Sequence, residues 1–196
     1  SAIVQFLPRE LRDFQADISG ARIDLVEAYS PDIPRMVSNR DVDLGIYHAA
    51  APAPGVTSLP YRTDRVVLVV PATHELASRG AIRLDEARGY DFLGYFPRHS
   101  FESFLELAGN TLTGPLNVRI QVANYEARCR MIREGLGVGV LPERIADTYI
   151  GQFGLAKVAL TDAWAKRQFY VCARDRAALR PVAAQLLAHL AGAAAQ

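Results

Sequence analysis

Apolar residues recur at helical spacing at both ends of the chain. Near the start, an apolar stripe with charged residues on the other face runs through Ile3, Phe6, Leu7, Leu11 and Phe14. Near the end, the clearest amphipathic stripe of the sequence runs through Leu179, Val182, Ala183, Leu186, Leu187 and Leu190. Spacings of three and four residues place such side chains on one face of a helix. The pattern therefore predicts that the chain opens and closes with a helix packed against a core.

Short apolar runs between these two helices predict strands. They lie at residues 42–47 (VDLGIY), 65–71 (RVVLVVP) and 167–174 (RQFYVCAR). The run at 65–71 is apolar at nearly every position, which is typical of a strand that is covered on both faces of a sheet.

One segment near the start alternates apolar and charged residues. Residues 21–29 (ARIDLVEAY) follow this pattern, which is typical of a half-buried strand, and they end at Ser30 and Pro31. A serine cap and a proline at the first helical position predict a short helix over 32–38, capped by Ser30. Strand, helix and strand in succession are the pattern of an α/β fold.

The middle of the chain repeats this alternation with different lengths. Strands are predicted at 92–95, 116–122 and 138–142, and helices at 101–108, 125–134 and from residue 142 onward. We find no low-complexity linker and no short repeat, only two blocks of strands and helices of similar size. The sequence therefore predicts two lobes.

The charge balance and the cysteine content limit the classes of function that the chain can have. The 22 Lys and Arg residues almost balance the 21 Asp and Glu residues, so the net charge is +1 and the chain lacks the basic excess that attracts nucleic acid. The two cysteines, Cys129 and Cys172, stand far apart, which suggests neither a metal site nor a disulfide framework and favours a reducing compartment. We expect two buried thiols and no cofactor or metal.

The ends of the chain carry no targeting signal. The first residues lack a basic leader, and the Ala-rich end is interrupted by Gln185, His189 and Gly192. We therefore expect no signal peptide, no membrane span and a cytoplasmic location.

Five motifs, taken in order, resemble the LysR-type transcriptional regulators of bacteria. They are SAIVQFLPREL at the start, IDLVEAYS at 23–30, DVDLGI at 41–46, DRVVLVVPATHELA at 64–77 and MIREGLGVGVLP at 131–142. Each motif alone is a weak signal, because apolar strand runs are common. Together, in this order and spacing, they cover roughly the whole chain and are fairly specific.

The resemblance implies the effector-binding half of such a regulator. It implies an α/β fold of two Rossmann-like lobes joined by two crossover strands, like the type 2 periplasmic binding proteins, with crossings near 63–70 and 166–171. Lobe I would comprise residues 1–63 and 168–196, and lobe II residues 64–167. Family members also have a strand just before the Ser-Ala-Ile helix and an N-terminal winged helix-turn-helix, and this sequence contains neither.

The resemblance also implies partners. We expect a small-molecule effector, such as a carboxylate or an aromatic metabolite, held in the cleft between the lobes. We further expect a homodimer or homotetramer, and contact with DNA only through the missing N-terminal domain.

Nine residues are candidates for the effector site, because the family binds its effector with loops at strand ends and helix starts, where unpaired N–H groups favour an anion. They are Ser1, Ser30, Tyr47, His48, His99, Ser100, Phe101, Asn124 and Tyr125. The nearby Arg98 can supply positive charge. A histidine such as His48 can pair with a carboxylate when protonated or accept a hydrogen bond when neutral.

Each candidate also has a purely structural interpretation. Ser1, Ser30 and Asn124 can be ordinary helix caps, and Ser100 can cap a helix whose Phe101 is a core residue. His48 can equally be a solvated loop histidine. Both interpretations stay open on the sequence alone.

The GLGVGV stretch is not a dinucleotide loop, because its glycines follow a helix and precede a strand. Gly135 is expected to end the helix, and Gly137 and Gly139 are expected to allow close packing.

Two other functions compete with the effector-sensing function that the resemblance implies. The sequence holds no G-x-S-x-G, H-E-x-x-H or phosphate-loop motif, so we expect no enzyme. A solute-binding protein of a transporter shares the implied fold and is the alternative function.

Overall fold

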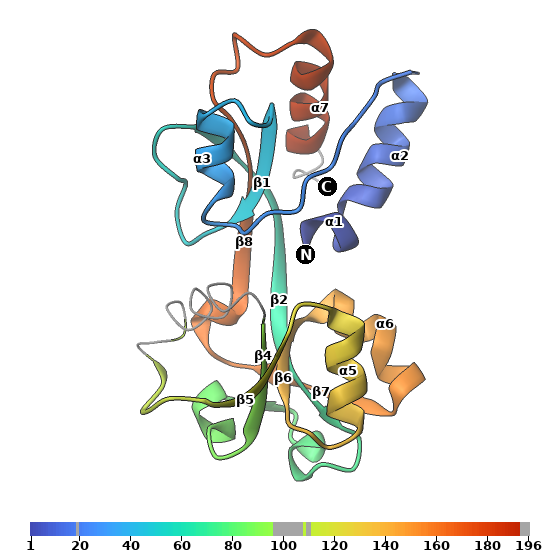
Figure 1. The fold of residues 1–196 in the computed structure, drawn as a ribbon, viewed down its shortest axis with the longest axis vertical. Helices are drawn as coiled ribbons and strands as arrows, with labels where there is room; N and C mark the ends of the chain where they lie inside the picture. Colours follow the sequence, from blue (N-terminus) through green and yellow to red (C-terminus); the bar gives the residue numbers. More distant parts are fainter. Residues whose placement is uncertain (19, 96–107, 109–110, 193–196) are drawn as a thin grey trace. The chain divides into compact units, whose positions relative to one another are not determined.

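The chain folds into two compact units. The computed structural model describes residues 1–18, 20–95, 108 and 111–192. Unit 1 comprises Ser1–Asp64 and Arg167–Gln196, and unit 2 comprises Arg65–Lys166 (Figure 1). The chain thus leaves unit 1 along strand β2 (Thr57–Pro71) and returns to it at the start of strand β8 (Lys166–Ala173).

Unit 1 has helices on both faces of a short sheet. In this sheet β1 (Leu44–His48) pairs antiparallel with β8, and β8 lies beside β2. The helices are α1 (Ala2–Gln5), α2 (Leu7–Asp17), α3 (Ile33–Ser38) and α7 (Pro181–Gly192) (Figure 1). Both terminal helices predicted from the apolar stripes are confirmed.

The side chains of unit 1 form two core clusters because successive residues of a strand point to opposite faces. One cluster contains Phe6, Leu7, Tyr61, Phe169, Val171, Ala173, Leu187 and Leu190. The other contains Val37, Tyr47, Tyr170 and Cys172. The neighbours Phe169 and Tyr170 therefore belong to different cores.

Unit 2 is organised around the second part of β2. This strand pairs antiparallel with both β6 (Gly139–Pro142) and β7 (Leu155–Leu160), and β3 (Ala81–Ile82) pairs parallel with β7. A second sheet joins β4 (Asp91–Tyr95) and β5 (Asn117–Val122) in parallel. The helical elements are α5 (Tyr125–Arg133), α6 (Glu143–Phe153) and the 3-10 helices η1 (Glu75–Ser78), η2 (Leu84–Ala87) and η4 (Ala163–Ala165).

The apolar run at 65–71 is confirmed as a strand buried on both faces. Val66, Leu68 and Val70 lie in one core cluster of unit 2, whereas Val67 and Val69 lie in the other. Each of these five valine and leucine side chains is at most 6% exposed. Continuous apolar character thus reports a central strand here, as expected.

The strand expected at 21–29 is absent. This segment has no partner in any sheet of the described residues, and its apolar residues Leu25 and Val26 are 51% and 59% exposed. The alternating pattern is present, but a strand also needs a neighbour for its backbone hydrogen bonds. The helix expected at 101–108 lies outside the described residues except for Ala108.

Both cysteines are buried hydrophobes, as expected. Cys129 and Cys172 are free thiols with no exposed surface. Burial raises the pKa of each thiol to about 11. Such thiols stay protonated and unreactive at neutral pH.

The helices of the two units are short. The longest of those described, α7, has 12 residues. None of the helices in the described ranges is both long enough and apolar enough to cross a membrane.

Candidate functional site

The end of β1 places His48 in a polar position of unit 1. Its backbone N–H donates to the Ser30 hydroxyl oxygen at 3.3 Å, and its ring packs edge-to-face against Phe169 with the centroids 5.6 Å apart. Burial and, to a smaller extent, the positive charge of Arg167 lower the pKa of His48 to about 3. His48 is therefore a neutral imidazole at physiological pH, able to donate one hydrogen bond and to accept another.

Ser30 does not cap α3, which corrects the expectation from the Ser-Pro pair. Residues 31 and 32 form a turn, helix α3 begins at Ile33 with Asp32 at its N-cap position, and no side chain caps it. The Ser30 hydroxyl instead accepts from His48, 18 residues away. The structure thus brings two of the predicted residues together.

Ser1 lies near the same group of residues. It occupies the N-cap position of α1, where its carbonyl oxygen accepts from Val4 and Gln5 but its side chain makes no capping bond. The backbone nitrogen of Ser1 lies near His48, so Ser1, Ser30 and His48 share one region of unit 1.

Tyr47 belongs to the opposite face of the sheet. Its ring stacks on Tyr170, with 5.6 Å between the centroids. Its hydroxyl pairs with the Ser58 hydroxyl at 2.9 Å and accepts from the backbone N–H of Ala53 at 2.7 Å. The structure therefore does not bring Tyr47 together with His48.

Arg167, which the sequence did not single out, lies near His48 and pairs with Asp64. The Asp64 carboxylate accepts from Arg167 Nε at 2.7 Å and from a second nitrogen of the same guanidinium, and Gln5 donates to it at 3.2 Å. The guanidinium carbon lies 5.3 Å from the centre of the Phe169 ring, the ring that His48 also contacts. No local signal could have revealed this pair, because its members are 103 residues apart.

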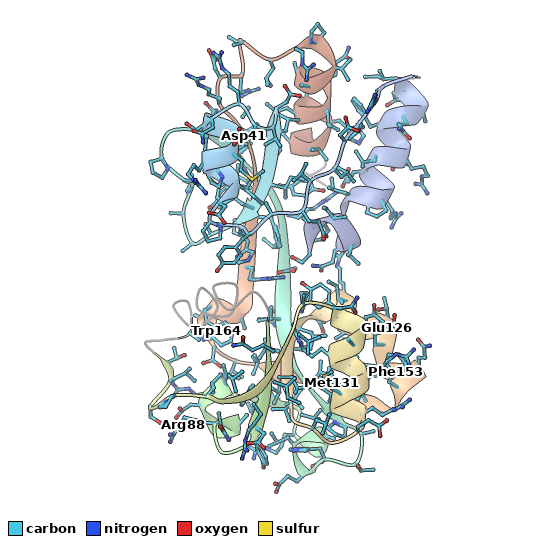
Figure 2. The ribbon with its side chains drawn as sticks, viewed as in Figure 1. Asp41, Arg88, Glu126, Met131, Phe153 and Trp164 are labelled. Atoms are coloured by element: carbon cyan, nitrogen blue, oxygen red, sulfur yellow. The ribbon has the colours of Figure 1, made fainter. Side chains whose placement is uncertain are left out.

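In unit 2, Asn124 is confirmed as a helix cap. Its side-chain oxygen accepts from the backbone N–H of Ala127 at 3.0 Å at the start of α5. Tyr125 is the first residue of this helix and is partly buried. On the same first turn, the carboxylate of Glu126, which is labelled in Figure 2, accepts a hydrogen bond from Arg130 at 2.9 Å. The predicted residues His99, Ser100 and Phe101, with Arg98, lie outside the described residues.

A fully buried arginine, Arg128, was also missed. Its guanidinium donates to the backbone oxygens of Val122 at 3.0 Å and Val140 at 3.4 Å, and its carbon lies 5.8 Å from the centre of the Tyr125 ring. Arg128 thus ties α5 to β5 and β6 and fixes the start of the helix that carries Asn124. A lone arginine in a helix is usually solvated, so its sequence position gave no hint.

Unit 2 also contains an open cavity of about 330 Å³. Its lining consists of Pro71, His74, Gly89, Tyr90, Asp91, Gly135, Gly137 and Val138. Of the predicted residues that the structure describes, none belongs to this lining. Within the described residues, no group of His, Cys, Asp or Glu side chains could hold a metal ion.

The neutral state of His48 gives a pH prediction. Its pKa is about 3 in the folded chain and about 6.5 when unfolded, so the unfolded state takes up the proton first as the pH falls. Stability conferred by the neutral ring is present above pH 6.5 and is lost progressively toward pH 3. Between pH 6.5 and about 5.5, this group alone should remove about 1 kcal/mol of unfolding free energy.

Urea denaturation at several pH values measures this loss. The His48→Asn variant, which cannot titrate at this position, should lack the contribution and show a shallower decline. An identical decline in the variant and the wild type would contradict the assigned neutral state.

Comparison with known proteins identifies relatives. Residues 1–195 match the family model described as the LysR substrate binding domain. The regulatory protein NocR of Agrobacterium tumefaciens (strain T37) is 25% identical over 146 residues, which are 74% of this chain and 49% of that protein. The match thus spans about half the length of this relative.

Solved structures share the fold of this chain. The effector binding domain of QuiR in complex with shikimate has a TM-score of 0.80 and 15% identity, with 97% of this chain and 91% of that chain covered. Full-length CbnR complexed with target DNA has a TM-score of 0.79 and 16% identity, with 100% of this chain and 68% of that chain covered. The predicted α/β architecture, like that of type 2 periplasmic binding proteins, is therefore confirmed.

Proposed function

The chain belongs to the LysR substrate-binding domain family, and on this premise we propose that it is the ligand-sensing domain of a bacterial transcriptional regulator. Its task would be to bind a small-molecule effector and to transmit the binding to DNA-binding domains. The observation that carries the proposal is the Ser30 and His48 pair at the end of β1, on a fold shared with a shikimate-bound domain. A neutral imidazole and a hydroxyl suit a ligand with both hydrogen-bond donors and acceptors.

In this proposal, a separate domain of the regulator binds the DNA. The chain corresponds to about half of its relative NocR, and CbnR was solved at full length with its target DNA. A net charge of +1 is consistent with a domain that does not itself bind nucleic acid. We place the regulator in the cytoplasm as a homodimer or homotetramer, the forms that the resemblance implies.

Neither competing function is favoured. The relatives are named as regulators, which disfavours the alternative function of a solute-binding protein of a transporter. The same names point to a protein that is not an enzyme. The buried thiols are too basic to act as nucleophiles at neutral pH.

Thermal denaturation with added metabolites tests the proposal. A ligand that binds only the folded chain stabilises it by about 2.7 kcal/mol at a hundred times its Kd, so an effector should raise the Tm measurably. Shikimate, other small carboxylates and aromatic acids form the first set. If no metabolite raises the Tm, and the full-length protein regulates without one, the sensor function is wrong.

A regulatory effect also requires discrimination between two states. Only a ligand with different affinities for the two states of the regulator can shift their populations. DNA binding by the full-length protein with and without the stabilising metabolite would measure this difference.

A further inference from the structure

The open cavity of about 330 Å³ belongs to unit 2 alone. Its volume lies at the lower end of the range of small-molecule sites, which is about 300–1,000 Å³. The lining combines two aromatic rings, one carboxylate and the backbone of three glycines. This composition differs from that of the Ser30 and His48 pair in unit 1, and it determines which kind of ligand the cavity can hold.

The formal charge of the cavity is negative. Among the lining residues that the structure describes, Asp91 alone is an acid or a permanent cation, and its Oδ1 accepts from Asn117 at 2.5 Å and from Arg119 at 3.3 Å. The Arg119 and Asp91 side chains are 64% and 44% exposed, so water screens this pair and the arginine offsets the carboxylate only weakly. Oδ2 of Asp91 accepts from none of the described residues, and it is therefore available to a ligand.

The histidine of the cavity adds no positive charge. His74 Nδ1 accepts from the backbone N–H of Leu76 at 3.1 Å, so this nitrogen carries no proton. The ring is then the neutral tautomer with its proton on Nε2. The carboxylate of Asp91 is thus not balanced by an imidazolium on the other side of the cavity.

The backbone of the lining also favours a cation over an anion. The N–H groups of Tyr90, Gly135 and Val138 all donate to carbonyl oxygens of the chain, at 2.8–3.0 Å, and so are not free to bind an anion. Gly135 lies just beyond the end of α5, where a helix has its partial negative charge. The arginine of this last turn, Arg133, is paired with Glu134 at 2.6 Å.

Two rings supply an aromatic wall. The His74 and Tyr90 rings pack edge-to-face with 4.8 Å between their centroids. The Tyr90 hydroxyl donates to Glu75 at 2.5 Å, which holds the phenol ring in place and brings a second carboxylate close to the cavity. An aromatic ring attracts a cation through its electron-rich face, and tyrosine does so better when the cation is partly shielded from water.

We propose that this cavity is a second small-molecule site, which binds a small organic cation through Asp91 and the ring of Tyr90. The ammonium group of the ligand would donate to the free oxygen of Asp91 and lie against the aromatic wall. This site goes beyond the proposed sensor function and does not rest on it. Carboxylate ligands of the sensor site are not expected to bind here, because Asp91 would repel them.

Two probes of the same shape test the charge requirement. Benzylamine, which is protonated at neutral pH, and benzyl alcohol are titrated into the chain at millimolar concentrations while the imidazole signals are followed by NMR. The chain has four histidines, and the His74 signal is assigned as the one missing from His74→Asn. Benzylamine should shift the His74 signal saturably and bind about fivefold more tightly than benzyl alcohol. Benzoate should leave this signal in place.

Asp91→Asn tests the residue that supplies the charge. The substitution keeps the size of the side chain, and it should reduce the affinity for benzylamine about fivefold, to that for benzyl alcohol. Asp43→Asn is the matched control, because Asp43 also pairs with an exposed arginine and is 48% exposed, but lies in unit 1. This control should keep the full preference for benzylamine.

Tyr90 offers a second, independent pair of variants. Tyr90→Leu removes the ring and should weaken benzylamine binding about twofold to fivefold. Tyr90→Phe keeps the ring and loses only the hydrogen bond to Glu75, so it should retain most of the affinity. The NMR spectrum of each variant verifies its fold.

Three results would overturn the inference. They are a His74 signal that benzylamine does not move, equal binding of benzylamine and benzyl alcohol to the wild type, and an undiminished preference for benzylamine in Asp91→Asn. None of these results bears on the sensor function, which is tested by ligands at His48 in unit 1.

Discussion

Replacing Asp64 by alanine should lower the free energy of unfolding by about 3–5 kcal/mol. The substitution removes the carboxylate to which Arg167 donates two hydrogen bonds, in a place where the Asp64 side chain is 1% exposed. Breaking a buried pair from one side costs more than the pair contributes, because the remaining charge stays withdrawn from water. Urea denaturation monitored by circular dichroism measures the change.

Asp43 provides a matched control for Asp64. It also pairs with an arginine, Arg180, but the two side chains are 48% and 78% exposed. Asp43→Ala should therefore change the unfolding free energy by about 1 kcal/mol or less. The double variant Asp64→Asn/Arg167→Gln should recover much of the loss of Asp64→Ala. Similar losses for Asp64→Ala and Asp43→Ala would show that the buried pair is not as the structure has it.

Replacing Gly137 by alanine should cost about 3 kcal/mol, from backbone strain and overpacking together. Gly137 has φ +147°, and a Cβ atom there would lie 2.6 Å from the carbonyl oxygen of Asp91. That carbonyl accepts the backbone N–H of Val138 at 2.8 Å, so it cannot move aside without breaking the contact between β4 and residue 138. The free energy of unfolding in urea measures the cost.

Gly80 is the control for Gly137. A Cβ atom at Gly80 would meet open space, and its φ lies outside the left-handed region, so Gly80→Ala should stay within about 0.5 kcal/mol of the wild type. A Gly137→Ala variant as stable as Gly80→Ala would refute the close approach assigned to the GLGVGV stretch.

Local patterns predicted the regular elements well, because periodicity is a property of neighbouring residues. The stripe from Ile3 to Phe14 became α1 and α2, and the run at 65–71 became the centre of β2. Gly135, expected to end a helix, follows α5 with φ +75°. In each case the signal and the structure lie within the same few residues.

Predictions failed where the decisive partner is distant in sequence. Residues 21–29 have the alternation of a strand but no neighbouring strand among the described residues. The two-residue strand β3 exists because Ile82 pairs with Leu160, which no short window contains. Ser30 was expected to cap α3, but its hydroxyl oxygen instead accepts a hydrogen bond from the backbone N–H of His48.

The candidate site was predictable only in part. Family motifs singled out Ser1, Ser30 and His48, and the structure places these in one region of unit 1. The sequence could not give the protonation state of His48, since the state depends on burial and on Arg167. Nor could it give the pairing of Arg167 with Asp64, because two strands far apart in sequence bring them together.

The most direct test of the account compares two histidines of the chain. Wild type, His48→Asn and His74→Asn are each heated with the same set of metabolites, and the Tm is recorded. His74 belongs to unit 2 and lines its open cavity, so it is a control for loss of a histidine elsewhere. We predict that at least one metabolite raises the Tm of the wild type and of His74→Asn but not that of His48→Asn. A set that raises none of the three, or raises all three alike, would contradict a ligand site at His48.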